Sequence, residues 1–268
     1  MYFIDNDKIY DLFYEVSKKF IIPNFKNLKS NQINYKNNTE IVTLIDIEVE
    51  KYLQKKLINF INNSYFVGEE IYTNNKNIID FYKQKQYCWT VDPIDGTSNY
   101  VKGKENFAIM IALTYSSTII QSWIYKPITE QFFYSKLDEG AYLNSKKIKI
   151  KKSNSMTEAI GSISTKYWDI NLDNKIKILK NNFKQIDHYG SIGCEYIDIV
   201  LGKRDFTILS KLSPWDHLPG VLMVREAGGY DSHFDGYRYL FNQISKNLIV
   251  SSSKNLNNEI INKIKEIK

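Results

Sequence analysis

Two aspartates separated by two residues follow a short apolar run near the middle of the chain. Residues 89–99 have the sequence WTVDPIDGTSN, in which the aspartates are Asp92 and Asp95. Both carboxylates can face one point from the end of a strand, and the Ile94 carbonyl can add an oxygen between them. Hard cations such as Mg²⁺ prefer oxygen ligands of this kind. Asp-Pro and Asp-Gly are also ordinary turn formers, so this stretch alone is compatible with either a magnesium site or a turn.

The segment after Asp95 is suited to opening a helix. Helix N-termini carry free backbone N–H groups and a partial positive charge, which attract phosphate. We therefore expect the N–H groups of Gly96 and Thr97 to form an anion site beside the cation site. The Thr97 hydroxyl can aim a water molecule at phosphorus, or it can simply cap the helix.

Acidic side chains recur in three further motifs. Glu69 and Glu70 are adjacent, and Asp216 stands at the expected start of a helix within SPWDHLPG. Asp46 and Glu50 share a helical face at i and i+4, a like-charge pair that disfavours the helix unless a cation lies nearby. Each motif also has a plain structural interpretation: Glu70 as an exposed acid, Asp216 as a helix cap, and the Asp46 and Glu50 pair as a solvated helix face.

Hydrophobic periodicity predicts the elements that must position these acids. Helical spacing indicates helices over residues 4–25 and 43–61. Four short β-rich runs, at 87–91, 107–114, 119–125 and 131–135, predict an antiparallel meander packed under the two helices. Strand and helix patterns then alternate, with strands at 160–164 and 248–251 and helices near 175–179, 193–201, 216–227 and 255–267.

The predicted elements fall into two halves. Residues 1–145 form an α+β half that carries most of the acids, and residues 146–268 form an α/β half that contributes Asp216 and the substrate contacts. The chain contains no internal repeat and no linker rich in Gly, Ser or Pro.

Composition limits the classes of function. The chain has 268 residues, of which 43% are apolar, enough for a sizeable core. Its net charge of +6 is weak evidence for nucleic acid and is compatible with small anionic substrates. The two cysteines, Cys88 and Cys194, lack the spacing of a disulfide framework or a zinc site. No apolar run approaches a membrane span, and no signal peptide is evident. We expect a cytoplasmic protein.

Four of these motifs resemble the inositol monophosphatase family when they are taken together. They are VTxxDxxxE, GEE, DPIDGTxNY and PWDHxPG, in this order and at these separations. The resemblance covers nearly the whole chain. It implies a layered αβαβα sandwich, as in inositol monophosphatase and fructose-1,6-bisphosphatase. It also implies a lithium-sensitive hydrolase that removes phosphate with two to three Mg²⁺ ions per active site and forms a homodimer.

The resemblance also implies roles for individual residues. Glu69, Asp92 and the Ile94 carbonyl would bind the first metal, and Asp92, Asp95 and Asp216 would bind the second. Thr97 and Asp46, with Glu69, would act on the attacking water. The residues implied in substrate binding are Asp95, Gly96, Thr97, Gly190, Ile192, Glu195 and Asp216.

The chain departs from the family pattern in the region that contacts the alcohol. Inositol-specific members have an acid seven positions before the WD aspartate, whereas this chain has Leu209. Glu195 could compensate, or it could be a first-turn acid favoured by the helix dipole. Lys36 resembles a family lysine near the metals, or it is a surface lysine. For His217 we expect a packed or hydrogen-bonded side chain, although it could approach the leaving group.

Several alternatives stay open on the sequence alone. The aspartyl-nucleophile phosphatases have one residue between the aspartates of DxDGT, whereas this chain has two. The spacing therefore disfavours a mechanism with an aspartyl nucleophile. Histidinol phosphate, fructose 1,6-bisphosphate and 3′-phosphoadenosine 5′-phosphate are alternative substrates. An RNA or transcription partner is an alternative of another class, because Lys146, Lys147, Lys149, Lys151 and Lys152 could form a basic patch. A solvated strand edge is the interpretation that we favour for these lysines.

Overall fold

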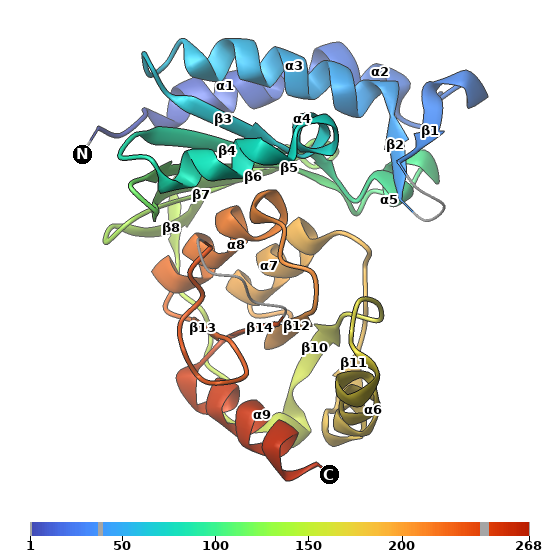
Figure 1. The fold of residues 1–268 in the computed structure, drawn as a ribbon, viewed down its shortest axis with the longest axis vertical. Helices are drawn as coiled ribbons and strands as arrows, with labels where there is room; N and C mark the ends of the chain where they lie inside the picture. Colours follow the sequence, from blue (N-terminus) through green and yellow to red (C-terminus); the bar gives the residue numbers. More distant parts are fainter. Residues whose placement is uncertain (1, 37–39, 242–246, 268) are drawn as a thin grey trace.

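Five layers of helices and sheets are stacked in the computed structural model of the chain (Figure 1). The structure describes residues 2–36, 40–241 and 247–267. The helices are α1 (Asn6–Val16), α2 (Ile22–Asn24), α3 (Leu44–Ile58), α4 (Glu69–Asn74), α5 (Thr97–Val101), α6 (Ile170–Leu179), α7 (Ile192–Val200), α8 (Pro214–Glu226) and α9 (Lys254–Glu266). The strands are β1 (Ile33–Tyr35), β2 (Ile41–Thr43), β3 (Tyr65–Gly68), β4 (Tyr87–Asp95), β5 (Ala108–Tyr115), β6 (Thr118–Lys126), β7 (Gln131–Lys136), β8 (Gly140–Leu143), β9 (Lys146–Ile148), β10 (Ile160–Ile163), β11 (Gln185–Ile186), β12 (Phe206–Leu209), β13 (Tyr230–Ser232) and β14 (Leu248–Ser251).

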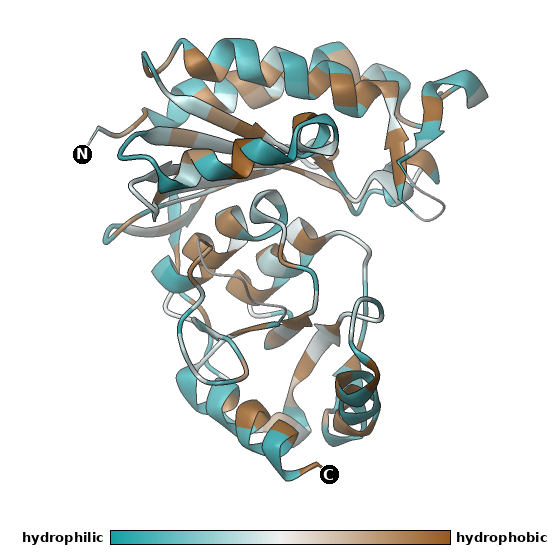
Figure 2. Ribbon diagram, viewed as in Figure 1, coloured by the Kyte–Doolittle hydropathy of each residue, from teal (hydrophilic) through white to brown (hydrophobic). Residues whose placement is uncertain are grey.

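The layers follow the order α, β, α, β, α that the family resemblance implied. Helices α1 and α3 cover one face of a seven-stranded sheet, and α7 and α8 cover the other (Figure 1). A five-stranded sheet lies beyond α7 and α8, and α6 and α9 pack on its outer face. Figure 2 shows hydrophobic residues concentrated on α7 and α8, the layer that is buried between the two sheets. The expected sandwich is therefore confirmed.

The first helix forms because apolar residues line one of its faces. Asp5 caps α1 by accepting a hydrogen bond from the Asp7 N–H, and Ile9, Leu12 and Phe13 are buried against the sheet. The predicted helix over 4–25 continues past α1 through a π-helical stretch, Ser17–Ile21, into α2. Two backbone-distorting features, the π-helical stretch and Pro23, therefore do not end the helix before Asn24.

The seven-stranded sheet contains the predicted meander. Strands β4 to β9 pair antiparallel with their neighbours in sequence order, and β3 pairs parallel with β4. Every residue of β4 after Tyr87 is buried because both faces of this strand are covered by helices. Strand β9 lies at the edge of the sheet, and its Lys146 and Lys147 are exposed, which is the arrangement of a solvated strand edge.

The five-stranded sheet has the order β11-β10-β12-β14-β13. Its strands β10, β11 and β12 are parallel, and β14 is antiparallel to both β12 and β13. The division of the chain at residue 145 stays a prediction. The seven-stranded sheet itself continues to Ile148, which pairs with Ala141.

Within the described ranges, no helix combines the length and the apolar character needed to cross a lipid bilayer.

Candidate active site

A β-bulge at the end of β4 brings Asp92 and Asp95 to the same face of the sheet. Residues three apart in a regular strand point to opposite faces. Here Asp92 pairs with Met110 and Asp95 pairs with Ala108, so the three-residue step on β4 matches a two-residue step on β5. The extra residue is the signature of a bulge. Both aspartates therefore face the layer that contains α7 and α8, because Met110 and Ala108 belong to the core on that side.

The turn after the bulge connects Asp92 to Thr97. The Asp92 Oδ1 accepts a hydrogen bond from the Ile94 N–H at 3.0 Å. The Ile94 carbonyl oxygen lies 3.0 Å from the Thr97 hydroxyl. Gly96 caps α5 with a φ of 90°, a left-handed conformation that costs other residues free energy. The DPIDGT motif is therefore both a turn and an acidic site.

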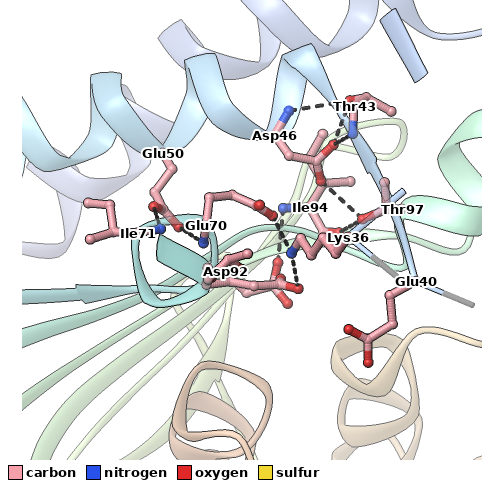
Figure 3. A network of polar contacts seen from close by, with 12 residues as sticks. Lys36, Glu40, Thr43, Asp46, Glu50, Glu70, Ile71, Asp92, Ile94 and Thr97 are labelled. Carbon is pink, nitrogen blue, oxygen red and sulfur yellow. Dashed lines mark hydrogen bonds and ion pairs between the residues drawn. The ribbon is translucent and has the colours of Figure 1, made fainter. Parts of the chain in front are cut away.

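Asp46 lies in the first turn of α3 and contacts Thr97 across the site (Figure 3). Its Oδ2 accepts hydrogen bonds from the Thr43 N–H, at 2.8 Å, and from the Thr43 hydroxyl, which forms a capping box. Its Oδ1 lies 3.0 Å from the Thr97 hydroxyl. Asp46 is 1% exposed, so the interpretation as a solvated helix face is wrong. Burial raises the pKa of Asp46 to about 6, although the bonds from Thr43 oppose the shift.

Glu50, one turn further along α3, caps α4 from outside that helix. Its two carboxylate oxygens accept hydrogen bonds from the N–H groups of Glu70 and Ile71, both at 2.8 Å (Figure 3). These are first-turn N–H groups of α4, which have no partner inside the helix. A Cβ at Gly68 would lie 2.4 Å from the Glu50 carboxylate, so only glycine allows this approach. Burial raises the pKa of Glu50 to about 7. This capping role was not predicted from the sequence. The i, i+4 spacing of Asp46 and Glu50 indicated only that the two acids share one face of the helix.

Lys36 holds the two adjacent glutamates at the start of α4. Its Nζ lies 2.7 Å from Glu69 Oε1 and 2.7 Å from Glu70 Oε1, and the Lys36 side chain is 9% exposed. The interpretations of Lys36 as a surface lysine and of Glu70 as an exposed acid are therefore wrong. Burial opposes the charge on Lys36, but the two carboxylates outweigh it and raise its pKa. Burial and the Glu69 carboxylate raise the pKa of Glu70 to about 8.

Asp95 is bound by the start of α7, which joins the two halves of the site. Its Oδ1 accepts a hydrogen bond from the Ile192 N–H at 3.0 Å. Its Oδ2 accepts from the Gly193 N–H at 2.8 Å and from the Ser191 hydroxyl at 2.5 Å. Burial raises the pKa of Asp95 to about 6, while these three bonds oppose the shift. Asp95 therefore has a structural role in addition to its predicted role as a metal ligand.

Asp216 lies in the first turn of α8, where Ser213 occupies the N-cap position and Pro214 begins the helix. The predicted N-cap is therefore off by three residues, because Asp216 lies inside the helix. Burial raises the pKa of Asp216 well above its usual range, and the carboxylates of Glu69 and Asp95 raise it further. These effects show that residues from α4, β4 and α8 share one electrostatic environment.

The acids of this environment fit a hard cation chemically. Burial raises the pKa of Asp92 well above its usual range, and the carboxylates of Glu69, Asp95 and Asp216 add to the shift. Charges that repel one another in a buried site favour a cation between them, and carboxylate and carbonyl oxygens are the ligands that Mg²⁺ prefers.

The acids are nevertheless not converged into a coordination shell. In the ranges that the structure describes, no group of three or more His, Cys, Asp and Glu side chains is arranged so that it could hold a metal ion. Two contacts account for this arrangement: Lys36 is bonded to Glu69, and α7 is bonded to Asp95. Lys36 contacts only Oε1 of Glu69, so Glu69 could bind an ion through its other carboxylate oxygen or in exchange for Lys36.

Glu195 lies in the first turn of α7, and its charge contributes to the raised pKa of Asp95. It is 1% exposed, and its carboxylate accepts hydrogen bonds from the Ser162 hydroxyl at 2.5 Å and the Tyr189 N–H at 3.1 Å. It also forms an ion pair of 2.9 Å with His188 Nδ1. Glu195 therefore orients His188, a residue that sequence analysis did not single out.

Two other positions named for the alcohol side are Gly190 and Leu209. Gly190 adopts a φ of 71° just before α7, and the neighbouring Tyr189 carbonyl accepts a hydrogen bond from Asn99 of α5. Leu209 is the last residue of β12 and is 6% exposed. The position of the family acid is therefore occupied by a buried apolar side chain.

His217 is packed, as we expected. Its Nε2 lies 2.7 Å from the Lys211 carbonyl oxygen, and its Nδ1 lies 3.1 Å from the Tyr196 hydroxyl. Burial lowers the pKa of His217 to about 4. A neutral ring that donates from Nε2 and accepts at Nδ1 satisfies both bonds.

A cavity of about 410 Å³ opens beside the acids. Its lining includes Lys36, Glu69, Lys211, Ser213 and Trp215. It gives a small molecule access to Glu69 and to the first turn of α8.

Comparison with known proteins places this site in context. The family model described as "Inositol monophosphatase family" matches residues 5–268. The chain is 27% identical to the fructose-1,6-bisphosphatase/inositol-1-monophosphatase of Thermotoga maritima over 228 residues, which is 85% of this chain and 84% of that protein. It is 27% identical to the inositol-1-monophosphatase of Bacillus subtilis, over 76% of this chain and 77% of that protein.

A further relative and two solved structures extend the comparison. The Nus factor SuhB of Pseudomonas aeruginosa is 26% identical over 81% of each chain. The structure of a Thermotoga maritima inositol monophosphatase superposes with a TM-score of 0.81 at 24% identity, covering 98% of this chain and 97% of that one. The SuhB structure from Bartonella henselae superposes with a TM-score of 0.83 at 22% identity, covering 97% of this chain and 98% of that one. At these identities the superpositions show a shared fold.

Proposed function

Because the chain belongs to the inositol monophosphatase family and is a phosphomonoesterase, we propose that it hydrolyses a small, soluble phosphomonoester with the help of Mg²⁺. One observation carries this proposal. The buried carboxylates of Asp92 and Asp95 on β4 and the half-buried carboxylates of Glu69 on α4 and Asp216 on α8 repel one another at the end of β4, beside an open cavity. A cluster of this kind needs cations, and the phosphate of the substrate needs them as well.

The residues that would hold the ions form two sets. Glu69, Asp92 and the Ile94 carbonyl would hold the first ion, and Asp92, Asp95 and Asp216 the second. Two to three Mg²⁺ ions, when bound, supply positive charge to the phosphate and make water a better nucleophile at neutral pH. In the structure, Lys36 forms an ion pair with Glu69 and another with Glu70.

Thr97 and Asp46 would orient the attacking water. The Thr97 hydroxyl lies 3.0 Å from Asp46 Oδ1, so donation to Asp46 leaves the Thr97 oxygen free to accept a hydrogen bond from water. With a pKa raised to about 6, Asp46 is mostly ionised at neutral pH and can accept this bond. Glu69 would complete the group that acts on the water. The N–H groups of Gly96 and Thr97 would donate to the phosphate.

The alcohol part of the substrate would lie toward the second half of the chain. In the proposal, the residues that contact the alcohol part are Gly190, Ile192 and Asp216. Unmodified inositol is a poorer fit than in inositol-specific relatives, because Leu209 offers no acceptor for its hydroxyl groups. Glu195 would act only indirectly, through His188.

The proposal includes a homodimer in the cytoplasm, as the family resemblance implies. Size-exclusion chromatography with light scattering measures the assembly, and a mass equal to one chain of 31.5 kDa at micromolar concentration contradicts the dimer. The names of the SuhB relatives raise a transcription-linked role, but the exposed lysines of β9 lie at a solvated strand edge. We therefore propose catalysis as the primary function.

The test is phosphate release with Mg²⁺ and with EDTA. The substrates are inositol 1-phosphate, histidinol phosphate, fructose 1,6-bisphosphate and 3′-phosphoadenosine 5′-phosphate. We expect turnover of at least one of them with Mg²⁺, none with EDTA, and none by Asp92→Asn. Asp80→Asn, which alters an exposed ion pair with Lys83, is the matched control and should retain full activity. Turnover at an unchanged rate in EDTA would refute the proposal.

A further inference from the structure

A second cavity, of about 240 Å³, lies at the carboxyl ends of two parallel strands. It is lined by residues 164–167, which follow β10, by Ser210 and Lys211, which follow β12, and by His188. The carboxyl edge of parallel strands is the usual position for ligands in α/β sheets. This cavity and the larger one share Lys211 in their linings, so a substrate bound at the acids can extend into it.

The charged residues that line this cavity are basic. They are Lys166, Lys211 and His188, and no acidic residue is among the described residues of the lining. The His188 imidazole is held by its ion pair with Glu195. That bond raises the pKa of His188, and the carboxylate of Asp95 adds to the shift. The ion pair with Glu195 therefore fixes Nδ1 of His188, and the His188 side chain lines the cavity.

Glu40 shows how these groups bind an anion. Its Oε1 lies 2.6 Å from Lys211 Nζ and accepts a hydrogen bond from the Tyr167 hydroxyl at 3.1 Å. A lysine and a tyrosine from two different loops therefore converge on one carboxylate oxygen. Figure 3 shows the Glu40 carboxylate directed away from the Asp46 and Thr97 contact, toward the second half of the chain.

Tyr167 adopts a strained backbone conformation to make this contact. Its φ is 67°, which is uncommon for a bulky residue. In this conformation its ring also lies 5.4 Å from Lys211 Nζ, so Tyr167 both stacks against the cation and shares its anionic partner.

We propose that Lys166, Tyr167, His188 and Lys211 form a subsite for an anionic substituent on the alcohol part of the substrate. This inference rests on the proposed function and narrows its substrate class. The preferred substrate is a phosphomonoester whose alcohol carries a second phosphate or a carboxylate. The substituent takes the place of the Glu40 carboxylate at Lys211 and Tyr167. Leu209 agrees with this class, because a buried apolar residue replaces the acid that would repel such a substituent.

The test compares pairs of substrates that differ by one anionic group. Fructose 1,6-bisphosphate with fructose 1-phosphate tests a phosphate, and 3-phosphoglycerate with glycerol 3-phosphate tests a carboxylate. For at least one pair we expect kcat/KM to be about 10-fold or more higher for the substrate with the extra anion, equivalent to about 1.4 kcal/mol. This ratio should fall as ionic strength rises. The pair with the larger ratio identifies the substituent.

Variants test whether the subsite causes the ratio of kcat/KM between the two substrates of a pair. Lys211→Gln and Lys166→Gln should each reduce the ratio several-fold. Glu40→Gln should raise it, because the variant removes the competing carboxylate, whereas a purely structural loss would lower both rates. The control is Lys147→Gln, an exposed lysine of β9 that should leave the ratio unchanged. Circular dichroism spectra confirm that each variant is folded.

The outcomes separate this inference from the proposed function. If both members of each pair are hydrolysed at equal kcat/KM, the subsite is refuted while the phosphatase activity stands. If Lys211→Gln lowers both rates equally, the subsite is also refuted. If Mg²⁺ supports no hydrolysis of any substrate in either pair or in the four-substrate assay, the proposed function itself fails.

Discussion

Replacement of Glu50 by glutamine tests whether this buried acid holds α4 and its glutamates in place. Glutamine keeps one oxygen acceptor but places an NH₂ group where the second carboxylate oxygen lies. One of the two N–H groups, that of Glu70 or that of Ile71, then loses its acceptor. A buried donor without a partner costs about 1–3 kcal/mol, so we expect the free energy of unfolding to fall by this amount at pH 5.

The effect should depend on pH because Glu50 titrates in the wild type. Its pKa in the folded protein is raised to about 7 from its usual 4.5, so the folded state binds the proton more tightly than the unfolded state. This contribution to stability is fully present below pH 4.5 and is lost as the pH rises through about 7. The loss amounts to about 3 kcal/mol. Glu50→Gln lacks the contribution at every pH, so the variant should approach or exceed wild-type stability at pH 8.

The assay is urea denaturation in EDTA at pH 5, 6, 7 and 8, with wild type, Glu50→Gln and Glu48→Gln. Glu48 is exposed on the same helix and is the matched control. A difference in unfolding free energy between wild type and Glu50→Gln that stays constant across this range refutes the reasoning.

A second measurement connects Glu50 to the proposed metal site. Because α4 begins with Glu69, movement of this helix should raise the Mg²⁺ concentration for half-maximal activity about 10-fold or more. The Glu48→Gln control should show no such change. An unchanged Mg²⁺ requirement in Glu50→Gln would show that Glu50 does not position the ligand.

Three further predictions concern the acids and the water. Asp216→Asn should lower kcat at least about 100-fold and leave the fold intact. Asp95→Asn should lower kcat as well and should also lower the free energy of unfolding, because Asp95 binds α7. Kinetics and denaturation together check this contrast, and equal stability of the two variants contradicts it. Thr97→Val should lower kcat about 100-fold or more while Thr97→Ser retains most activity, since only the hydroxyl is needed; similar rates for the two variants in a steady-state assay exclude the role. Lithium at millimolar concentration should inhibit phosphate release by competing with Mg²⁺, and a titration without inhibition counts against the proposed metal chemistry.

Local signals determined the long helices, the central strands and the order of the acidic motifs. The predicted strand at 248–251 coincides with β14, and the predicted helix over 43–61 contains α3. These elements are long or strongly patterned, so one buried face is visible in the residues themselves. Strands β11, β12 and β13 were not predicted. They have two to four residues, and a run this short gives only a weak period.

The surroundings of the acids could not be inferred from local signals. Glutamate is usually an exposed residue. Glu50 and Glu70 are nevertheless buried, because Glu50 caps α4 and Lys36 pairs with Glu70. Glu195 was expected near the substrate, but its carboxylate is directed to His188 and Ser162. In each case the partner is at least seven residues away in the chain, so only tertiary packing decides which groups meet.

The sequence by itself determined which atoms are available for chemistry: paired carboxylates at a strand end and a threonine beside them. The tertiary structure decided how those atoms are used, because the direction of a buried side chain depends on every layer packed against it. The bulge at Asp92 and Asp95, the cap that Glu50 supplies and the convergence of Lys211 and Tyr167 on Glu40 all arise where segments distant in sequence meet.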